Sequence, residues 1–163
     1  MTAAKTPLAK VFKVENRLAK LARSPGGKTV EEAVTSAEQR IESVRERCVA
    51  ALALKAEQLA ETAAGDRDAL ASETLDGLYN ISNAIFGVAG VYGLEALAEA
   101  ACSLCDLLHG FRNGETVNWS AVDVHVDGIR LLATGRVDGA SEGAASVLEG
   151  LRRVRARFVP VVI

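Results

Sequence analysis

The chain has 163 residues, a formal net charge of −2, an apolar share of 49% and only 4% aromatic residues. This length suits one domain with a sizeable core, and a composition rich in Ala, Leu and Val is typical of helices that pack closely through small side chains. No apolar run reaches the roughly 18 residues that a membrane span needs, and the N-terminal sequence lacks the apolar region of a secretory signal. We therefore expect a cytoplasmic helical protein with no membrane partner.

The charge is unevenly distributed along the chain. Residues 1–28 contain seven Lys or Arg side chains and one acidic residue, Glu15, whereas residues 29–163 contain twelve basic and twenty acidic side chains. A basic segment beside an acidic body is typical of a solvated helix face, and the alternative is contact with an acidic partner. Because Phe12 is the only aromatic residue of the basic segment, we expect no nucleic-acid partner. We divide the chain into a basic N-terminal helix and loop (1–28) and a helical domain (29–163).

The first two predicted helices are separated by a breaker. Apolar residues at spacings of three and four predict an amphipathic helix over residues 8–23, which the Ser-Pro-Gly-Gly sequence at 24–27 ends. Thr29 and Glu32 match a capping box, in which the hydroxyl accepts from an early backbone N–H and the carboxylate reaches back. A long helix is therefore predicted from this box to about Ala64.

An apolar stripe runs along this long helix. Its members recur at alternating spacings of four and three, and Leu52 and Leu59 continue the stripe after a phase shift. Such a repeat predicts a helix–helix seam, either inside the bundle or between two copies of the chain. The members before the shift are Val30, Val34, Ala37, Ile41, Val44, Cys48 and Ala51.

Later helices follow at short intervals. Gly93 is expected to break the chain near Tyr92, Ser120 with Asp123 resembles a second capping box, and Ser141 is the predicted cap of the last helix. Short loops between long amphipathic helices indicate antiparallel neighbours, so we predict an all-α, up-down bundle with a four-helix core and an additional N-terminal amphipathic helix. The later helices are predicted over 67–91, 94–111, 120–133 and 141–158.

Residues 82–97 contain the most informative pattern of the chain. Gly87, Gly90 and Gly93 recur at three-residue spacing across the end of one predicted helix and the turn into the next. With the helix lengths on both sides, this pattern resembles a histidine-phosphotransfer (HPt) domain, and most closely the HPt domain of chemotaxis histidine kinases. The resemblance extends over residues 66–135 and includes the segments 97–101, 106–108 and 112–115.

The resemblance implies a phosphotransfer site that has lost the residues needed for phosphotransfer. It places Asn83 at the position of the phosphorylated His, Phe86 at the position of the charge-compensating Lys, and Cys105 at the position of the Glu that orients the ring. Cys102 falls where the chemotaxis type has a second His. An amide nitrogen has a delocalised lone pair and Phe has no charge, so neither can replace the family's residues. The resemblance therefore implies no catalytic residue, and we expect neither a cofactor nor a metal.

The Cys102-Ser-Leu-Cys105 sequence has a second interpretation as a redox pair or half a zinc site. No second Cys or His pair occurs at zinc spacing, and the odd cysteine count, completed by Cys48, argues against a disulfide framework. We interpret both residues as small packing residues, with a redox switch on the docking surface as the alternative.

The predicted function is that of a signalling adaptor in a bacterial two-component pathway, with chemotaxis as the pathway that the resemblance suggests. It would bind a response-regulator receiver domain or a histidine kinase. One alternative is active phosphotransfer through His109 or His125, although His109 suits a helix C-terminus and His125 is expected at the surface or at an interface. Another is a structural protein that dimerises through the stripe over 30–59. The predicted partner-binding residues are Asn83, Phe86, Gly87, Gly90, Cys102 and Cys105.

Two interpretations are possible for the surroundings of Phe86. It follows Asn83 by three residues, so both lie on one side of their helix, which the family leaves open to the partner. Alternatively, the basic helix over 8–23 covers Phe86 and acts as a lid.

Overall fold

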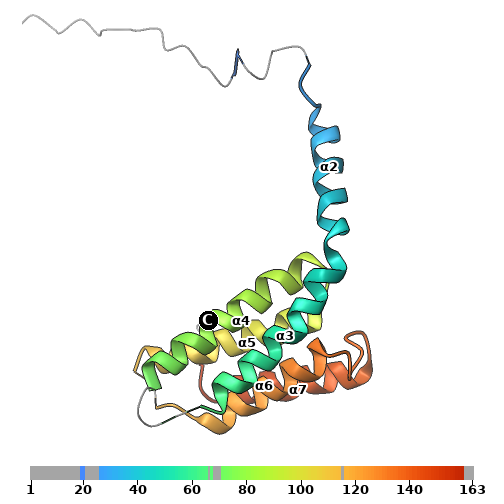
Figure 1. Cartoon of the computed structure of the whole chain (residues 1–163). Helices are drawn as coiled ribbons and strands as arrows, with labels where there is room; N and C mark the ends of the chain where they lie inside the picture. Colours follow the sequence, from blue (N-terminus) through green and yellow to red (C-terminus); the bar gives the residue numbers. More distant parts are fainter. Residues whose placement is uncertain (1–18, 21–25, 66, 68–70, 115, 160–163) are drawn as a thin grey trace, which may run out of the picture. The chain divides into compact units, whose positions relative to one another are not determined.

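A computed structural model describes residues 19–20, 26–65, 67, 71–114 and 116–159 (Figure 1). The chain divides into two compact units, residues 1–41 and 42–163. The regular secondary structure of the described residues is helical and includes no strand, so the all-α prediction is confirmed for them. The predicted helix over 8–23 lies outside the described residues, apart from Ala19 and Lys20, which are helical. The helices are α2 (Val30–Ser43), α3 (Arg45–Ala63), α4 (Ala71–Val91), α5 (Glu95–Arg112), α6 (Trp119–Ala133) and α7 (Glu142–Arg155).

The capping box at the start of α2 is confirmed. The backbone N–H of Glu32 donates to the Thr29 hydroxyl at 3.1 Å, and the N–H of Thr29 donates to the Glu32 carboxylate at 2.8 Å. The predicted continuous helix to Ala64 is wrong, because the chain departs from helical geometry at Val44, with φ −108° and ψ 0°. Two helices therefore replace one.

The phase shift in the apolar stripe does not coincide with this break, because it falls inside α3, between Ala51 and Leu52. In α3 the buried residues are Leu52, Ala56, Leu59 and Ala63, again at spacings of four and three. Every residue of α2 is described, and none of them is buried. The part of the stripe after the shift therefore belongs to the core of residues 42–163, whereas the stripe residues on α2 are not buried.

The core of residues 42–163 is formed by α3 to α7. The helix α3 packs against α4 and α6, α5 packs against α4 and α6, and α7 packs against α5 and α6. Small and branched aliphatic residues fill the space between them, as the composition predicts. The largest fully buried apolar side chains are Leu52, Leu59, Leu78, Ile85, Leu104, Leu107, Leu108, Ile129 and Val122.

The turn between α4 and α5 forms at Gly93, as predicted. Gly93 has φ +68°, a conformation that glycine adopts without strain, and the N–H of Leu94 donates to the carbonyl of Ala89 at 3.0 Å. Arg112, at the end of α5, pairs with Asp76 near the start of α4, with 2.6 Å between Nε and Oδ1. The two helices therefore run antiparallel.

One of the later predicted caps is confirmed and the other is wrong. Ser141 caps α7 by accepting from the N–H of Ala144 at 3.2 Å. The N-cap of α6 is Asn118, which accepts from the N–H of Ala121 at 2.9 Å, and not the predicted Ser120. Asp123, the other half of the predicted box, instead pairs with Arg67 at 2.7 Å. Asn caps a helix at least as well as Ser, so the earlier residue starts the helix.

Over the described residues, no helix has both the length and the apolar character needed to cross a bilayer.

Candidate functional site

The outer face of α4 carries no charge after Asp76. A quarter of the chain's residues are charged, yet none occurs between Asp76 and Glu95. The side chains of Phe86 and Val91 on this helix are 42% and 61% exposed. Charged residues are depleted at the centre of protein interfaces, so an exposed uncharged helix face is a candidate docking surface. Its exposed residues are Asn80, Asn83, Phe86, Gly87, Gly90 and Val91.

Contacts of Arg112 locate this face beside α5. The Arg112 guanidinium pairs with Asp76 and lies over the ring of Tyr79, with its central carbon 4.8 Å from the ring centroid. Asn83 and Phe86 continue the series from these two residues at helical spacing, so they lie on the same side of α4. The candidate face therefore borders α5.

The same ion pair relates the predicted site residues across the two helices. Seven residues are about two helical turns. Asn83 lies two turns after Asp76 along α4, and Cys105 lies two turns before Arg112 along α5. Because the two helices are antiparallel, both steps lead in the same direction in space. A further step of three residues along each helix leads to Phe86 on α4 and to Cys102 on α5. The register therefore places Asn83 level with Cys105, and Phe86 level with Cys102.

The glycines at 87 and 90 have no role in the packing of the described residues. A Cβ atom added at either position meets no described atom within 4 Å, and neither residue has a positive φ. Gly128 on α6 differs, because a Cβ there would lie 3.2 Å from the side chain of Leu151. Glycine inside a helix costs about 1 kcal/mol of stability relative to Ala. The fold therefore explains Gly128 but does not explain Gly87 or Gly90.

The cysteines of α5 are half-buried and free. Burial raises the pKa of the Cys105 thiol to about 12, with smaller contributions from Cys102 and Asp106. Burial also raises the pKa of Cys102, to which the nearby Asp106 carboxylate adds. Both thiols are therefore protonated at neutral pH, which suits packing residues better than a redox pair, because the thiolate is the reactive form.

His125 was predicted at the surface or at an interface, and it is fully buried, so the surface position is wrong. Its Nδ1 lies 2.8 Å from the carbonyl oxygen of Ala121, and its Nε2 lies 2.9 Å from the hydroxyl of Ser103. Since a carbonyl can only accept, Nδ1 carries the proton and the hydroxyl donates to Nε2. Both nitrogens are occupied, which excludes His125 as a phosphoacceptor in this conformation.

His109 lies in the last turn of α5, as predicted, and is exposed. Its Nε2 lies 2.9 Å from the side-chain amide nitrogen, Nδ2, of Asn113. The chain has two histidines, and both are described. Of these, His109 alone presents its ring to solvent.

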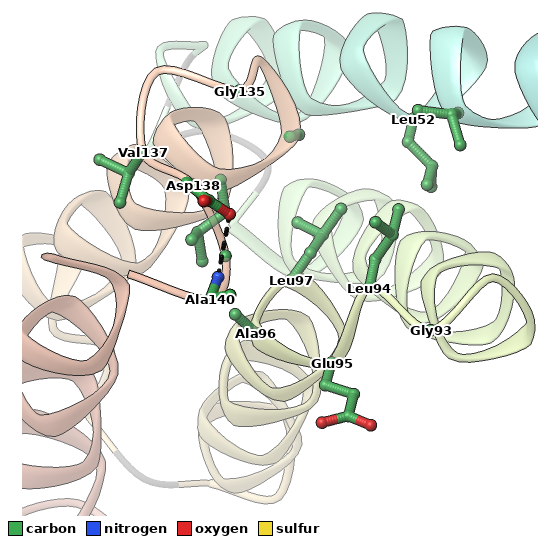
Figure 2. A pocket seen from close by; sticks show the side chains of 14 residues that line it. Leu52, Gly93, Leu94, Glu95, Ala96, Leu97, Gly135, Val137, Asp138 and Ala140 are labelled. Atoms are coloured by element: carbon green, nitrogen blue, oxygen red, sulfur yellow. Dashed lines mark hydrogen bonds between the residues drawn. The ribbon is translucent and has the colours of Figure 1, made fainter. Parts of the chain in front are cut away.

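A cavity of about 610 Å³ lies where α4 turns into α5 and α6 leads to α7 (Figure 2). Leu52, Leu94 and Leu97 form an apolar wall of this cavity. Its acidic residues do not converge, because Asp138 accepts from the N–H of Ala140 at 3.1 Å and the side chain of Glu95 points away in Figure 2. The cavity was not predicted, and its signal in the sequence is the concentration of glycines in the two turns that line it, namely Gly93, Gly135 and Gly139.

Among the described side chains, no group of three or more Cys, His, Asp or Glu residues is placed to hold a metal ion. Comparison of the chain with protein-family models, with curated proteins and with solved structures finds no match.

Proposed function

We propose that this chain is a non-catalytic, HPt-like signalling adaptor that binds a receiver domain or a histidine kinase of a bacterial two-component pathway, with chemotaxis as the candidate pathway. Binding uses the uncharged face of α4 around Asn83, Phe86, Gly87 and Gly90. The observation that carries the proposal is that this face exposes Phe86 beside two helical glycines that the protein's own packing does not use. Glycines of this kind are explained by a partner that approaches the helix backbone closely.

The packing of the helices supports the HPt-like part of the proposal. A four-helix bundle needs a closed circuit of neighbours, and α3, α4, α5 and α6 form one, with α7 packed on α5 and α6. We propose that these four helices run alternately up and down, as α4 and α5 do.

The chemistry of the site supports a binding role over a catalytic one. The exposed residue at the proposed phosphoacceptor position is Asn83, whose amide cannot accept a phosphoryl group as an imidazole does. A protonated Cys105 thiol at the same level cannot replace the carboxylate that would orient a histidine ring. Phe86 adds apolar contact area and no charge. The site therefore offers a partner an apolar contact surface and contains no nucleophile.

Active phosphotransfer is the second candidate, and the exposure of His109 is the observation that favours it. Arg112, one turn away, is engaged by Asp76, which leaves His109 without a dedicated cation for an incoming phosphoryl group. Incubation with a phosphorylated receiver domain separates the two candidates. The adaptor proposal predicts no acid-labile label on the chain, whereas label that disappears in His109→Ala establishes phosphotransfer.

A pull-down from a cell lysate tests the adaptor itself. The full chain is compared with Phe86→Glu and with Val124→Glu, a matched control on α6 whose original side chain is 47% exposed. We expect a receiver domain or histidine kinase to be retained by the natural chain and by Val124→Glu, and to be lost with Phe86→Glu. Equal retention by all three proteins contradicts a docking role for this face.

A further inference from the structure

The cavity beside the α4–α5 turn has the size and the lining of a small-molecule site. Its volume of about 610 Å³ lies within the roughly 300–1,000 Å³ that is usual for ligand sites. In Figure 2 the side chain of Leu52 on α3 points toward those of Leu94 and Leu97, which complete the apolar wall. Leu52 and Leu97 also belong to the core of residues 42–163. The wall is therefore part of the packed body of the protein.

The charges around the cavity favour a neutral ligand. No Lys, Arg or His occurs among the described residues that line it, so no basic side chain is present to balance an anion. The two acidic side chains do not form a site for a cation, because Asp138 accepts from the N–H of Ala140 at 3.1 Å and Glu95 points away in Figure 2. A charged group placed against the apolar wall would lose its water without gaining an ionic partner.

The start of α5 provides hydrogen-bond donors at one end of the cavity. The N–H of Ala98 donates to the carbonyl of Leu94 at 2.9 Å. The N–H groups of Glu95, Ala96 and Leu97 come before this bond, so they have no partner within the helix. The cap residue Leu94 has an apolar side chain, which makes no capping hydrogen bond. Because these residues line the cavity, an acceptor oxygen of a bound molecule can replace the missing cap.

The first turn of α5 also distinguishes between a neutral acceptor and an anion. A helix N-terminus alone favours negative charge, but Glu95 already supplies a carboxylate in this turn. A second carboxylate, carried by the ligand, would be repelled by it and would lie beside the apolar wall. A carbonyl oxygen therefore suits this end of the cavity better than a carboxylate.

We propose that this cavity binds a small neutral molecule that has an apolar body and one acceptor oxygen, as a ketone has. The apolar body lies against the leucine wall, and the oxygen accepts from the backbone at the start of α5. Removal of apolar surface from water drives the binding. The site does not use the uncharged face of α4, so the proposal goes beyond the adaptor proposal and does not depend on it.

Four aromatic compounds of similar size test the class of ligand. Acetophenone has the proposed neutral body and carbonyl oxygen, ethylbenzene lacks the oxygen, benzoate is an anion and benzylamine is a cation. Each compound is titrated into the isotope-labelled full chain, and the amide NMR signals are followed. We expect acetophenone to shift the signals of Ala96, Leu97 and Gly139, and to bind about fivefold more tightly than ethylbenzene, which is the effect of one hydrogen bond. Both charged compounds are expected to bind more weakly than acetophenone.

Three results of these titrations overturn the proposal. The first is that acetophenone does not bind. The second is that its signal changes lie only outside the cavity. The third is that any of the other three compounds binds as tightly as acetophenone or more tightly.

A substitution that fills the cavity tests its location. Ala140 lines the cavity and is exposed, so Ala140→Trp narrows the cavity without placing a large side chain in the core. Ala145→Trp is the matched control, because Ala145 is also exposed but lies on α7 outside the lining. We expect Ala140→Trp to weaken acetophenone binding at least about tenfold and Ala145→Trp to bind like the natural chain. Equal affinity of the two variants overturns the proposal. Unchanged helix content by circular dichroism separates loss of the site from loss of the fold, and the titrations of the natural chain depend on neither variant.

Discussion

The Ser103 hydroxyl donates to Nε2 of His125 across 2.9 Å, and this buried hydrogen bond joins α5 to α6. His125 donates in turn through Nδ1 to Ala121, so the neutral imidazole satisfies both of its nitrogens inside the protein. A protonated ring would lose its acceptor nitrogen and place a charge in the core, close to Arg155 of α7. The fold of residues 42–163 therefore requires this histidine to be uncharged.

This requirement makes stability dependent on pH. Burial is the main cause that lowers the pKa of His125 below its ordinary value, and repulsion by Arg155 adds to it. The unfolded chain then binds a proton at a higher pH than the folded chain, so stability is complete above the unfolded pKa of about 6.5 and falls as the pH decreases from there toward the folded pKa. Urea unfolding should show a lower midpoint at about pH 5 than at about pH 7.5.

The control for this prediction is His125→Gln, which does not titrate. We expect this variant to be less stable than the natural chain at neutral pH, because a core hydrogen bond and its packing change. Its midpoint should fall less between the two pH values. If the midpoint fell equally in both proteins, the pH dependence of stability would come from other titratable groups, such as carboxylates, and not from His125.

Alanine substitution should distinguish the two kinds of helical glycine. Gly90→Ala is expected to raise the free energy of unfolding by up to about 1 kcal/mol, because the residue gains helix propensity and its Cβ meets no described atom. Gly128→Ala is expected to lower it by about 1 kcal/mol or more, because its Cβ would crowd Leu151. Thermal unfolding of both variants measures the contrast, and a loss of stability in Gly90→Ala contradicts our account of the α4 face.

The start of α6 can be tested in the same way. Asn118→Ala removes the side chain that accepts from Ala121 and should cost about 1 kcal/mol of stability. Ser120→Ala should change stability little, because Ser120 is exposed and the cap is the earlier residue. Denaturant unfolding that finds the larger loss in Ser120→Ala would restore the capping box that the sequence predicts.

Local signals predicted the start and end of several helices. The capping box at Thr29, the cap at Ser141 and the turn at Gly93 each depend on contacts between residues a few positions apart, so the sequence contains the whole signal. The cap of α6 was missed because Asn118 and Ser120 are both good caps, and Asp123, the other half of the predicted box, pairs with the distant Arg67.

Features that depend on distant parts of the chain could not be predicted. The spacing of the stripe is equally regular on both sides of Val44, so it does not reveal the break there, or that α3 has buried residues whereas α2 has none. The burial of His125 depends on Ser103, 22 residues earlier in the chain. At the candidate site, the sequence indicated which residues share a face of α4. Which residues of α5 lie beside them follows from the ion pair between Asp76 and Arg112, which relates the two helices.

The most direct test of the adaptor proposal is a binding titration between the full chain and a purified receiver domain that the natural chain retains. Gly90→Leu is compared with Gly150→Leu, since both glycines are exposed, helical and free of contacts within 4 Å of an added Cβ among the described atoms. We predict that Gly90→Leu weakens binding at least about tenfold, because it blocks close approach to α4, and that Gly150→Leu binds like the natural chain. Equal affinity of the two variants would contradict the proposal that a partner docks on the uncharged face of α4.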